Sequence, residues 1–173
     1  SFNGKSFDIP LLQNRLVLNK LSFNFRQLPH LDMLHISRKM WRRKLASCAL
    51  KDLETAILDF ERTTEDVPGW MIPDIYFEYL RNGDPTRLRE VVYHNAQDIL
   101  SLAALFILVT QMLEQNAANE KISVDDLIAI SRVYWDMGSI DTSICILHSA
   151  LERKRGREQT AMAYSMLGTH YKK

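Results

Sequence analysis

Cysteine, glycine and proline are scarce in this sequence, and charge of neither sign dominates it. The 173 residues include two cysteines, six glycines and five prolines, and 22 Lys and Arg residues nearly balance 21 Asp and Glu residues. Cys48 and Cys145 form no CxxC pattern, which argues against a disulfide framework and a zinc site and favours a reducing, cytoplasmic compartment. The net charge of +1 provides no overall basic field, so a polyanion could bind only at a local basic patch.

Long hydrophobic runs are also absent. The longest run, Ile99–Val109, is shorter than the roughly 20 residues that cross a bilayer. We therefore expect it to form part of a buried core helix, and we expect no association with a membrane. The content of 46% hydrophobic and 25% charged residues is typical of a folded soluble protein, and the length allows one domain, or one domain with a small appendage.

Apolar residues at helical spacing run through most of the chain. Helices are predicted at residues 8–21, 37–45, 49–58, 73–81, 86–114, 124–137, 140–154 and 158–171. Leu31–Ile36 is the best candidate for a strand, and residues 115–120 form a polar connector that we take as the domain boundary. The fold is therefore predicted to be mostly α, with one domain at residues 1–115 and a helical region at residues 120–173.

The helical region has small and aromatic residues at regular positions. A full unit is followed by a partial copy, and the positions are Tyr134, Gly138, Ser143, Leu147 and Ala150, then Leu167, Gly168 and Tyr171. This pattern resembles the tetratricopeptide repeat, in which small residues let paired helices approach closely, and the resemblance implies a surface for a protein partner. The alternative is an ordinary helical hairpin that caps the first domain, because at least three repeats are usually required for stability.

Two polar segments carry the residue types needed for metal-assisted hydrolysis. In residues 2–8, the sequence Phe-Asn-Gly-Lys-Ser-Phe-Asp indicates the end of a strand and a tight turn that delivers Asp8 at a helix start. In residues 93–100, His94 and Asp98 are four positions apart, so they share one face of a helix. A carboxylate can bind a divalent cation, and an imidazole can take a proton from water. Taken separately, Asp8 is better explained as a helix cap, and His94 with Asp98 as a surface pair.

Together and in this order, the segments resemble the second and third motifs of the DEDD (DnaQ-like) 3′→5′ exonucleases of the ribonuclease H-like superfamily, in particular its YprB-type branch. The second motif is matched by Asn3, Phe7 and Asp8, and the third by His94 and Asp98. Further similarity lies in residues 30–35, 47–51 and 65–70 and at Ile72, Pro73, Tyr76 and Phe77. The resemblance covers about residues 1–110. It implies a ribonuclease H-like α/β domain.

The resemblance also implies hydrolysis of phosphodiester bonds in nucleic acid with two divalent cations, Mg²⁺ or Mn²⁺. Asp8 and Asp98 would bind the cations, and His94 would be the general base for the attacking water. Tyr93 precedes Asp98 by five positions, so the choice between Tyr93 and His94 as the base stays open. Helical geometry favours His94, because it lies nearly one turn from Asp98.

The first motif of the family, Asp-x-Glu on a strand, has no match before Asn3. Residues 52–54, Asp-Leu-Glu, have the right residue types but follow the second motif in a predicted helix, and we interpret them as a solvated turn. Two divalent cations carry four positive charges, whereas Asp8 and Asp98 supply two negative charges. We therefore expect this chain, which opens with Ser1 rather than Met, to be a fragment that lacks the first strands of a truncated α/β domain. We expect it to hold two cations only with the missing motif and to be inactive alone.

A local basic patch is predicted around Trp41. It contains Arg38, Lys39, Arg42, Arg43 and Lys44, and a second basic group contains Arg153, Lys154, Arg155 and Arg157. Basic residues beside an aromatic ring can follow a phosphate backbone and stack on a base. The candidates for substrate contact are therefore Asn3, Phe7, Arg38, Trp41, Arg42 and Arg43. The alternative is a solvated helix face, because Lys and Arg are mostly exposed in folded proteins.

The leading hypothesis is a metal-dependent nuclease domain, incomplete in this chain, that acts on single-stranded nucleic acid or 3′ ends and carries a helical region for a protein partner. The alternative is a non-catalytic ribonuclease H-like scaffold that acts through the helical region. We expect the sheet edge left by the missing strands to be covered in a homodimer or by an associated N-terminal fragment. The sequence leaves open both DNA and RNA as substrates, and both exonucleolytic and endonucleolytic cleavage.

Overall fold

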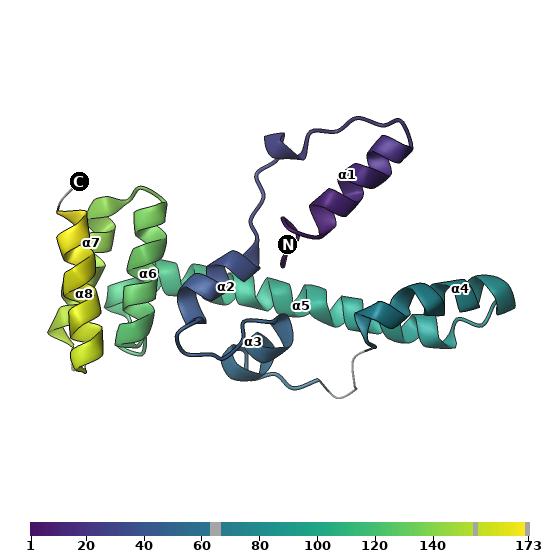
Figure 1. The fold of residues 1–173 in the computed structure, drawn as a ribbon. Coiled ribbons are helices and arrows are strands. Elements are labelled where there is room, and N and C mark those ends of the chain that lie inside the picture. Colours follow the sequence, from purple (N-terminus) through teal and green to yellow (C-terminus); the bar gives the residue numbers. More distant parts are fainter. Residues whose placement is uncertain (63–66, 154–155, 172–173) are drawn as a thin grey trace. The chain divides into compact units, whose positions relative to one another are not determined.

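The computed structural model describes residues 1–62, 67–153 and 156–171, and within these ranges the chain forms helices and no strand. Figure 1 shows the helices along the chain. They are α1 (Asp8–Leu18), α2 (Met33–Trp41), α3 (Leu50–Ile57), α4 (Ile72–Asn82), α5 (Thr86–Gln115), α6 (Val124–Asp136), α7 (Ile140–Glu152) and α8 (Arg157–His170). Short 3-10 turns lie at Phe25–Gln27, Gly69–Met71 and Asn116–Ala118. The prediction of a mostly α chain is confirmed for these residues.

Local sequence signals account for several helix ends. The N-cap of α6 is Ser123, whose hydroxyl oxygen accepts a hydrogen bond from the Asp126 amide (3.2 Å). Pro73 lies in the first turn of α4, and Gly83 ends this helix in the left-handed region at φ 72°. The predicted helices begin and end within a few residues of the observed ones, with the exception of α2.

Helix α2 occupies the segment in which the sequence predicts a strand. The predicted strand at Leu31–Ile36 is wrong, because Asp32 caps a helix that begins at Met33. The Asp32 side chain accepts a hydrogen bond from the Leu34 amide (3.2 Å) and so satisfies a free N–H group of the first turn. The expected helix start at Ser37 is therefore too late, and Ser37 is buried inside α2.

The chain divides into two compact units, which are residues 1–48 with residues 106–173, and residues 49–105. In the first unit, α6, α7 and α8 pack side by side (Figure 1), and α2 packs against α6. Gly138, at φ 81°, makes the turn between α6 and α7. The fully buried residues of the three packed helices include Leu127, Ile130, Ile146, Leu147, Ala150 and Ala163. The predicted division into residues 1–115 and 120–173 stays a prediction.

The second unit contains α3, α4 and the first part of α5. Residues 83–85 connect helices α4 and α5, and Arg87 of α5 pairs with Glu78 of α4 (3.0 Å). The Asp84 carboxylate accepts hydrogen bonds from the amide (3.0 Å) and the hydroxyl (2.6 Å) of Thr86, which fixes the start of α5. Ile75 of α4 is buried.

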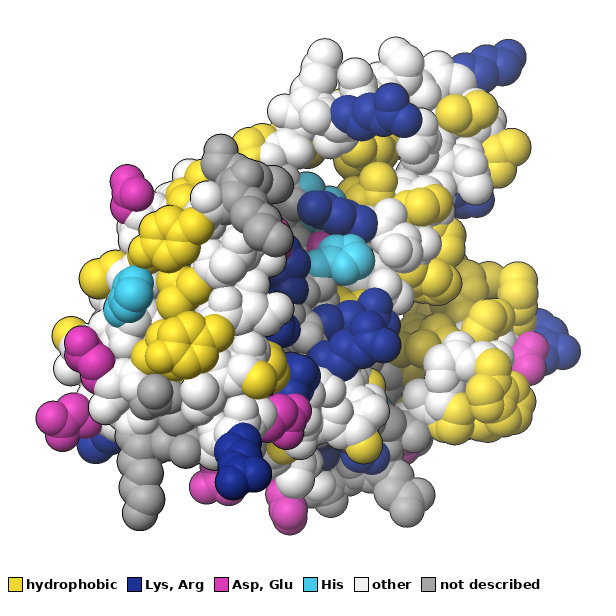
Figure 2. Space-filling model, turned by 60° about the vertical axis from the view of Figure 1, so that its left-hand side comes forward, with side chains coloured by type: hydrophobic (Ala, Val, Ile, Leu, Met, Phe, Trp, Pro, Cys, Tyr) yellow, Lys and Arg dark blue, Asp and Glu magenta, His cyan; other side chains and the backbone are white. Residues whose placement is uncertain are grey.

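Helix α5 is long and apolar enough to cross a membrane, with a mean hydropathy of 1.7 over an 18-residue window. Because 17% of that window is buried, the prediction of a buried core helix is wrong for the described structure. Within residues 99–109, apolar side chains lie on every side of the helix, and those of Ile99, Leu100, Phe106 and Ile107 are exposed. Figure 2 shows hydrophobic side chains at the molecular surface beside Lys and Arg. Core helices of soluble proteins pass the same test of length and hydropathy, so this finding alone does not place α5 in a membrane.

Candidate functional site

A buried carboxylate organises the segment that precedes α1. Asp32 is 1% exposed, and its two oxygens accept hydrogen bonds from the backbone amides of Asn3 (2.7 Å) and Lys5 (3.0 Å). The Leu34 amide is a third donor. Burial is the largest single influence and raises the pKa of Asp32, but the three backbone donors and His35 outweigh it. The pKa of Asp32 therefore lies below its ordinary value of 3.8.

The same contacts shape the turn that leads to Asp8. Asn3 adopts a left-handed φ of 63°, and the Ile9 amide donates to the Gly4 carbonyl (2.9 Å). A Cβ atom at Gly4 would overlap the Ser1 side chain and lie 3.2 Å from an Asp8 carboxylate oxygen. Glycine is therefore required at this close approach.

Asp8 is the first residue of α1, and its side chain is exposed. The N-cap of α1 is Phe7, and no side chain supplies a capping hydrogen bond there, so the interpretation of Asp8 as a cap is not what the structure shows. Phe7 is 62% exposed, and Asn3 is also exposed. The turn thus presents Asn3, Phe7 and Asp8 on the surface of the first unit.

His94 and Asp98 lie one turn apart on α5 in the second unit, in agreement with their spacing. His94 is half-buried, and its ring packs edge-on against Tyr93 with 5.8 Å between the ring centroids. The Tyr93 side chain is 47% exposed. This packing does not distinguish the two side chains, so the choice between Tyr93 and His94 as the general base stays open.

A buried arginine joins Asp98 to α3. Nε and Nη2 of Arg62 donate to the two carboxylate oxygens of Glu54 at 2.7 Å, and Nη2 also donates to Oδ1 of Asp98 at 2.6 Å. The side chains of Arg62 and Glu54 are 8% and 1% exposed, whereas the Asp98 side chain is 48% exposed. One guanidinium group thus faces a buried carboxylate and a surface carboxylate.

The sequence interpretation missed this cluster. Residues 52–54, interpreted as a solvated turn, lie in α3, and Glu54 is buried. The spacing contained the signal, because Leu53 and Ile57 mark the apolar face of α3 and Glu54 falls on that face. A carboxylate at such a position requires a cationic partner, and Arg62 is the first basic residue that follows it.

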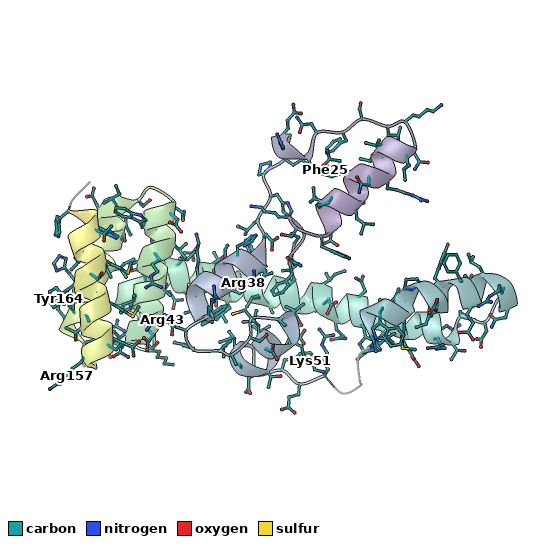
Figure 3. All side chains as sticks on the ribbon, in the orientation of Figure 1. Phe25, Arg38, Arg43, Lys51, Arg157 and Tyr164 are labelled. Atoms are coloured by element: carbon teal, nitrogen blue, oxygen red, sulfur yellow. The ribbon has the colours of Figure 1, made fainter. Side chains whose placement is uncertain are left out.

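Most cations of the predicted basic patch have acidic partners within the first unit. The pairs are Lys39 with Asp136, Arg43 with Glu158, and Lys44 with Asp126 (2.6 Å) and Ser123 (2.9 Å). Figure 3 labels Arg38 on α2 and Arg43 just after it. In the part of the chain that the structure describes, Arg38 and Arg42 are exposed and form no ion pair. Exposed ion pairs contribute only about 0–1 kcal/mol each, so a polyanion can compete with them.

Trp41 is buried rather than exposed beside the basic patch. It is 2% exposed, so the expectation that its ring stacks on a base is wrong for this conformation. A further cation lies near the patch on α6, where burial and, secondly, the nearby Arg43 lower the pKa of Arg132. Positive charge therefore extends from α2 onto α6.

The second basic group has a structural role at one of its residues. Arg153 donates hydrogen bonds to the carbonyls of Ile122 (2.6 Å) and Asn119 (3.2 Å) and so ties the end of α7 to the preceding connector. Lys154 and Arg155 lie outside the described residues. Glu65 and Asp66, which belong to the segment similar to the exonuclease family, also lie outside them.

The described residues show no complete set of metal ligands. Residues 1–62, 67–153 and 156–171 contain no group of three or more His, Cys, Asp or Glu side chains arranged to hold a metal ion. One oxygen of Asp98 accepts a hydrogen bond from Arg62. The two-cation centre that the family resemblance implies stays a prediction.

Comparison with known proteins identifies the family of the two polar segments. A family model described as the RNase H superfamily matches residues 1–110, which include both segments. The chain is 29% identical over 157 residues to a Bacillus subtilis (strain 168) protein named "Uncharacterized protein YprB", and the match covers 88% of this chain but 37% of that protein. No solved structure matches the chain significantly. Since the family model covers more than half of its length, the chain belongs to the ribonuclease H superfamily.

Proposed function

We propose that this chain takes part in metal-dependent hydrolysis of phosphodiester bonds in nucleic acid, as the portion of a 3′→5′ exonuclease-like domain that carries the second and third motifs. The match of residues 1–110 to the ribonuclease H superfamily carries the proposal, because it includes Asp8, His94 and Asp98. We place this activity in the cytoplasm, where Cys48 and Cys145, which form no disulfide, would stay reduced.

Asp8 and Asp98 are the proposed carboxylates of the site, and Mg²⁺ or Mn²⁺ is the cation class that carboxylate oxygens select. His94 would take a proton from the attacking water, since an imidazole exchanges protons near neutral pH. The described residues do not complete a metal centre by themselves. We therefore propose that the chain is inactive alone and gains activity when further carboxylates join Asp8 and Asp98.

The helices of residues 1–110 are proposed to be the helical part of an α/β ribonuclease H-like domain. Exposed apolar side chains on three helices support this proposal, because extensive apolar surface usually marks an interface. They include Leu11, Leu12, Val17 and Leu18 of α1, Tyr76, Phe77 and Leu80 of α4, and Val92, Ile99 and Leu100 of α5. A segment with the Asp-x-Glu motif on a strand is the proposed cover, and a second copy of the chain is the alternative cover.

The proposed substrate is single-stranded nucleic acid or a 3′ end. Arg38 and Arg42 are suited to phosphate contact because they are exposed and form no ion pair among the described residues. Arg43 would also contact phosphate if phosphate displaced its exposed partner Glu158. The exposed Phe7 ring offers a surface on which a base could stack.

A second candidate function is a non-catalytic ribonuclease H-like scaffold whose helices α6–α8 bind a protein partner. The contact of Arg62 with Asp98 favours it, because this contact engages a carboxylate that an enzyme would need. A tetratricopeptide-like tail is supported by the burial of Ser143, Leu147 and Ala150. Gly168 does not add support, since a Cβ atom there would meet nothing within 4 Å.

A nuclease assay distinguishes the two functions. A chain extended at its amino end by the sequence encoded upstream is expected to degrade end-labelled single-stranded DNA or RNA in the presence of Mn²⁺. Asp8→Asn and Asp98→Asn are each expected to lower the rate by at least about a hundredfold. Asp74→Asn, at an exposed acidic residue of the second unit, is the control and should leave the rate unchanged. No degradation by the extended chain would favour the scaffold, and a full rate in the Asp98→Asn protein would contradict the proposed role of Asp98.

A further inference from the structure

The contact between Arg62 and Asp98 differs from the exposed ion pairs of the same unit. Arg62 is anchored to Glu54 by two hydrogen bonds of 2.7 Å, and both side chains are almost fully buried. By contrast, the side chains of Arg87 and Glu78 are 47% and 45% exposed. Arg62 is therefore held in a fixed place from which Nη2 reaches Asp98 at 2.6 Å.

Glu54 explains why Arg62 stays at this place. A buried carboxylate that loses its cationic partner is strongly destabilising, so Glu54 retains Arg62 whatever happens at Asp98. The fork of the guanidinium group fits both oxygens of Glu54, and the Nη2 group still has a donor for a second acceptor. Asp98 supplies that acceptor from the neighbouring helix α5.

We propose that Arg62 is a positioning residue for Asp98, which it holds in one orientation while it acts as an internal counter-cation. Oδ1 of Asp98 accepts the hydrogen bond from Arg62, and the side chain is 48% exposed, so an external cation can approach the carboxylate. Such a cation competes with the positive charge of Arg62 and is bound weakly. A role of Asp98 in catalysis rests on the proposed function, whereas the contact of Arg62 with Asp98 does not.

Paramagnetic broadening of backbone amide NMR signals by Mn²⁺ tests this proposal on the whole chain. The double variant Glu54→Gln/Arg62→Met replaces the buried ion pair by uncharged side chains of similar size and frees Asp98. We expect Mn²⁺ to broaden the amide signals around Asp98 at a concentration about fivefold lower than in the parent chain. Addition of Asp98→Asn to the double variant should remove this gain.

Arg87→Met is the matched control, because it removes an exposed arginine from α5, the helix that carries Asp98. It should leave unchanged the Mn²⁺ concentration at which the amide signals around Asp98 are half broadened, which is the midpoint compared between the variants. Equal midpoints in the parent chain and the double variant would overturn the proposal, and so would an equal decrease with Arg87→Met.

A second measurement tests the contact between Arg62 and Asp98 if the double variant does not fold. Asp98→Asn changes a half-exposed side chain and keeps the pair of Arg62 with Glu54. It is expected to shift the ¹⁵Nη signals of Arg62 while the Nε signal, from the atom that donates to Glu54, changes little. Unchanged Nη signals would contradict the proposal. Neither measurement involves nucleic acid, so failure of the proposed nuclease function would leave both results intact.

Discussion

Single buried carboxylates organise both polar segments of this chain. Asp32 accepts hydrogen bonds from the backbone turn that precedes Asp8, and Glu54 anchors the arginine that reaches Asp98. Neither buried residue belongs to the second or the third motif, although Asp32 lies in residues 30–35, which carry further similarity to the family. Each surface carboxylate therefore depends on a residue outside the motif that contains it.

The contribution of Asp32 to stability is expected to depend on pH. Asp32→Ala should lower the free energy of unfolding by about 1–3 kcal/mol at neutral pH, because the amides of Asn3 and Lys5 lose their acceptor. The folded pKa of Asp32 is lower than its ordinary value of 3.8, so the ionised carboxylate stabilises the chain above that value. This stabilisation is lost as the pH falls through the folded pKa.

Urea denaturation of the parent and Asp32→Ala chains from neutral pH downward measures this effect. The difference between the two chains should begin to shrink below about pH 4. Asp141→Ala, at an exposed residue in the first turn of α7, is the control and should change stability less. A difference that stays constant down to the lowest pH would contradict the role of the ionised form.

Helices are the elements that the sequence predicts well, because each one places apolar residues on a repeating face. The prediction fails at residues 31–36, where the apolar spacing fits a strand or a helix and the cap formed by Asp32 decides the outcome. It also fails for the burial of α5, because the contacts of residues 99–109, which are apolar on all sides of the helix, depend on tertiary packing. For the candidate site, residue types and spacing predict Asp8, His94 and Asp98, whereas the contact with Arg62 requires the packing of separate segments.

Substitutions at two glycines test the backbone conformation inside α8 and at the end of α4. Gly168 lies inside α8 with open space around its Cβ position, so Gly168→Ala should raise the free energy of unfolding by about 0.5–1 kcal/mol. Gly83 ends α4 at φ 72°, so Gly83→Ala should lower it by about 1 kcal/mol. Thermal or urea denaturation measures both changes. Shifts in the same direction would show that one of the two helices is described wrongly.

The basic helix α2 provides a test of nucleic-acid contact. Arg38→Glu/Arg42→Glu should weaken binding of a single-stranded oligonucleotide about tenfold at moderate salt and should reduce the dependence of binding on salt. Fluorescence anisotropy measures both effects. Arg15→Glu/Lys20→Glu makes the same change of charge on and after α1 and is expected to have a smaller effect. An equal loss from both variants would mean that binding follows overall charge rather than the patch on α2.

One feature of the described residues agrees with the proposal that this chain works together with further structure. Large apolar side chains are exposed on α1, α4 and α5. The chain also spans about 37% of the length of the Bacillus subtilis relative that it matches. We therefore propose that both the apolar cover and the remaining carboxylates come from a segment outside these 173 residues.

The most direct test of this account is the Mn²⁺-dependent release of nucleotides from an end-labelled single-stranded oligonucleotide, measured for the 173-residue chain and for a chain extended upstream. We predict background release by the 173-residue chain and clear release by an extended chain that contains Asp-x-Glu on an apolar strand. Asp98→Asn should return the extended chain to background. Substantial release by the 173-residue chain alone, or none by the extended chain, would contradict the account.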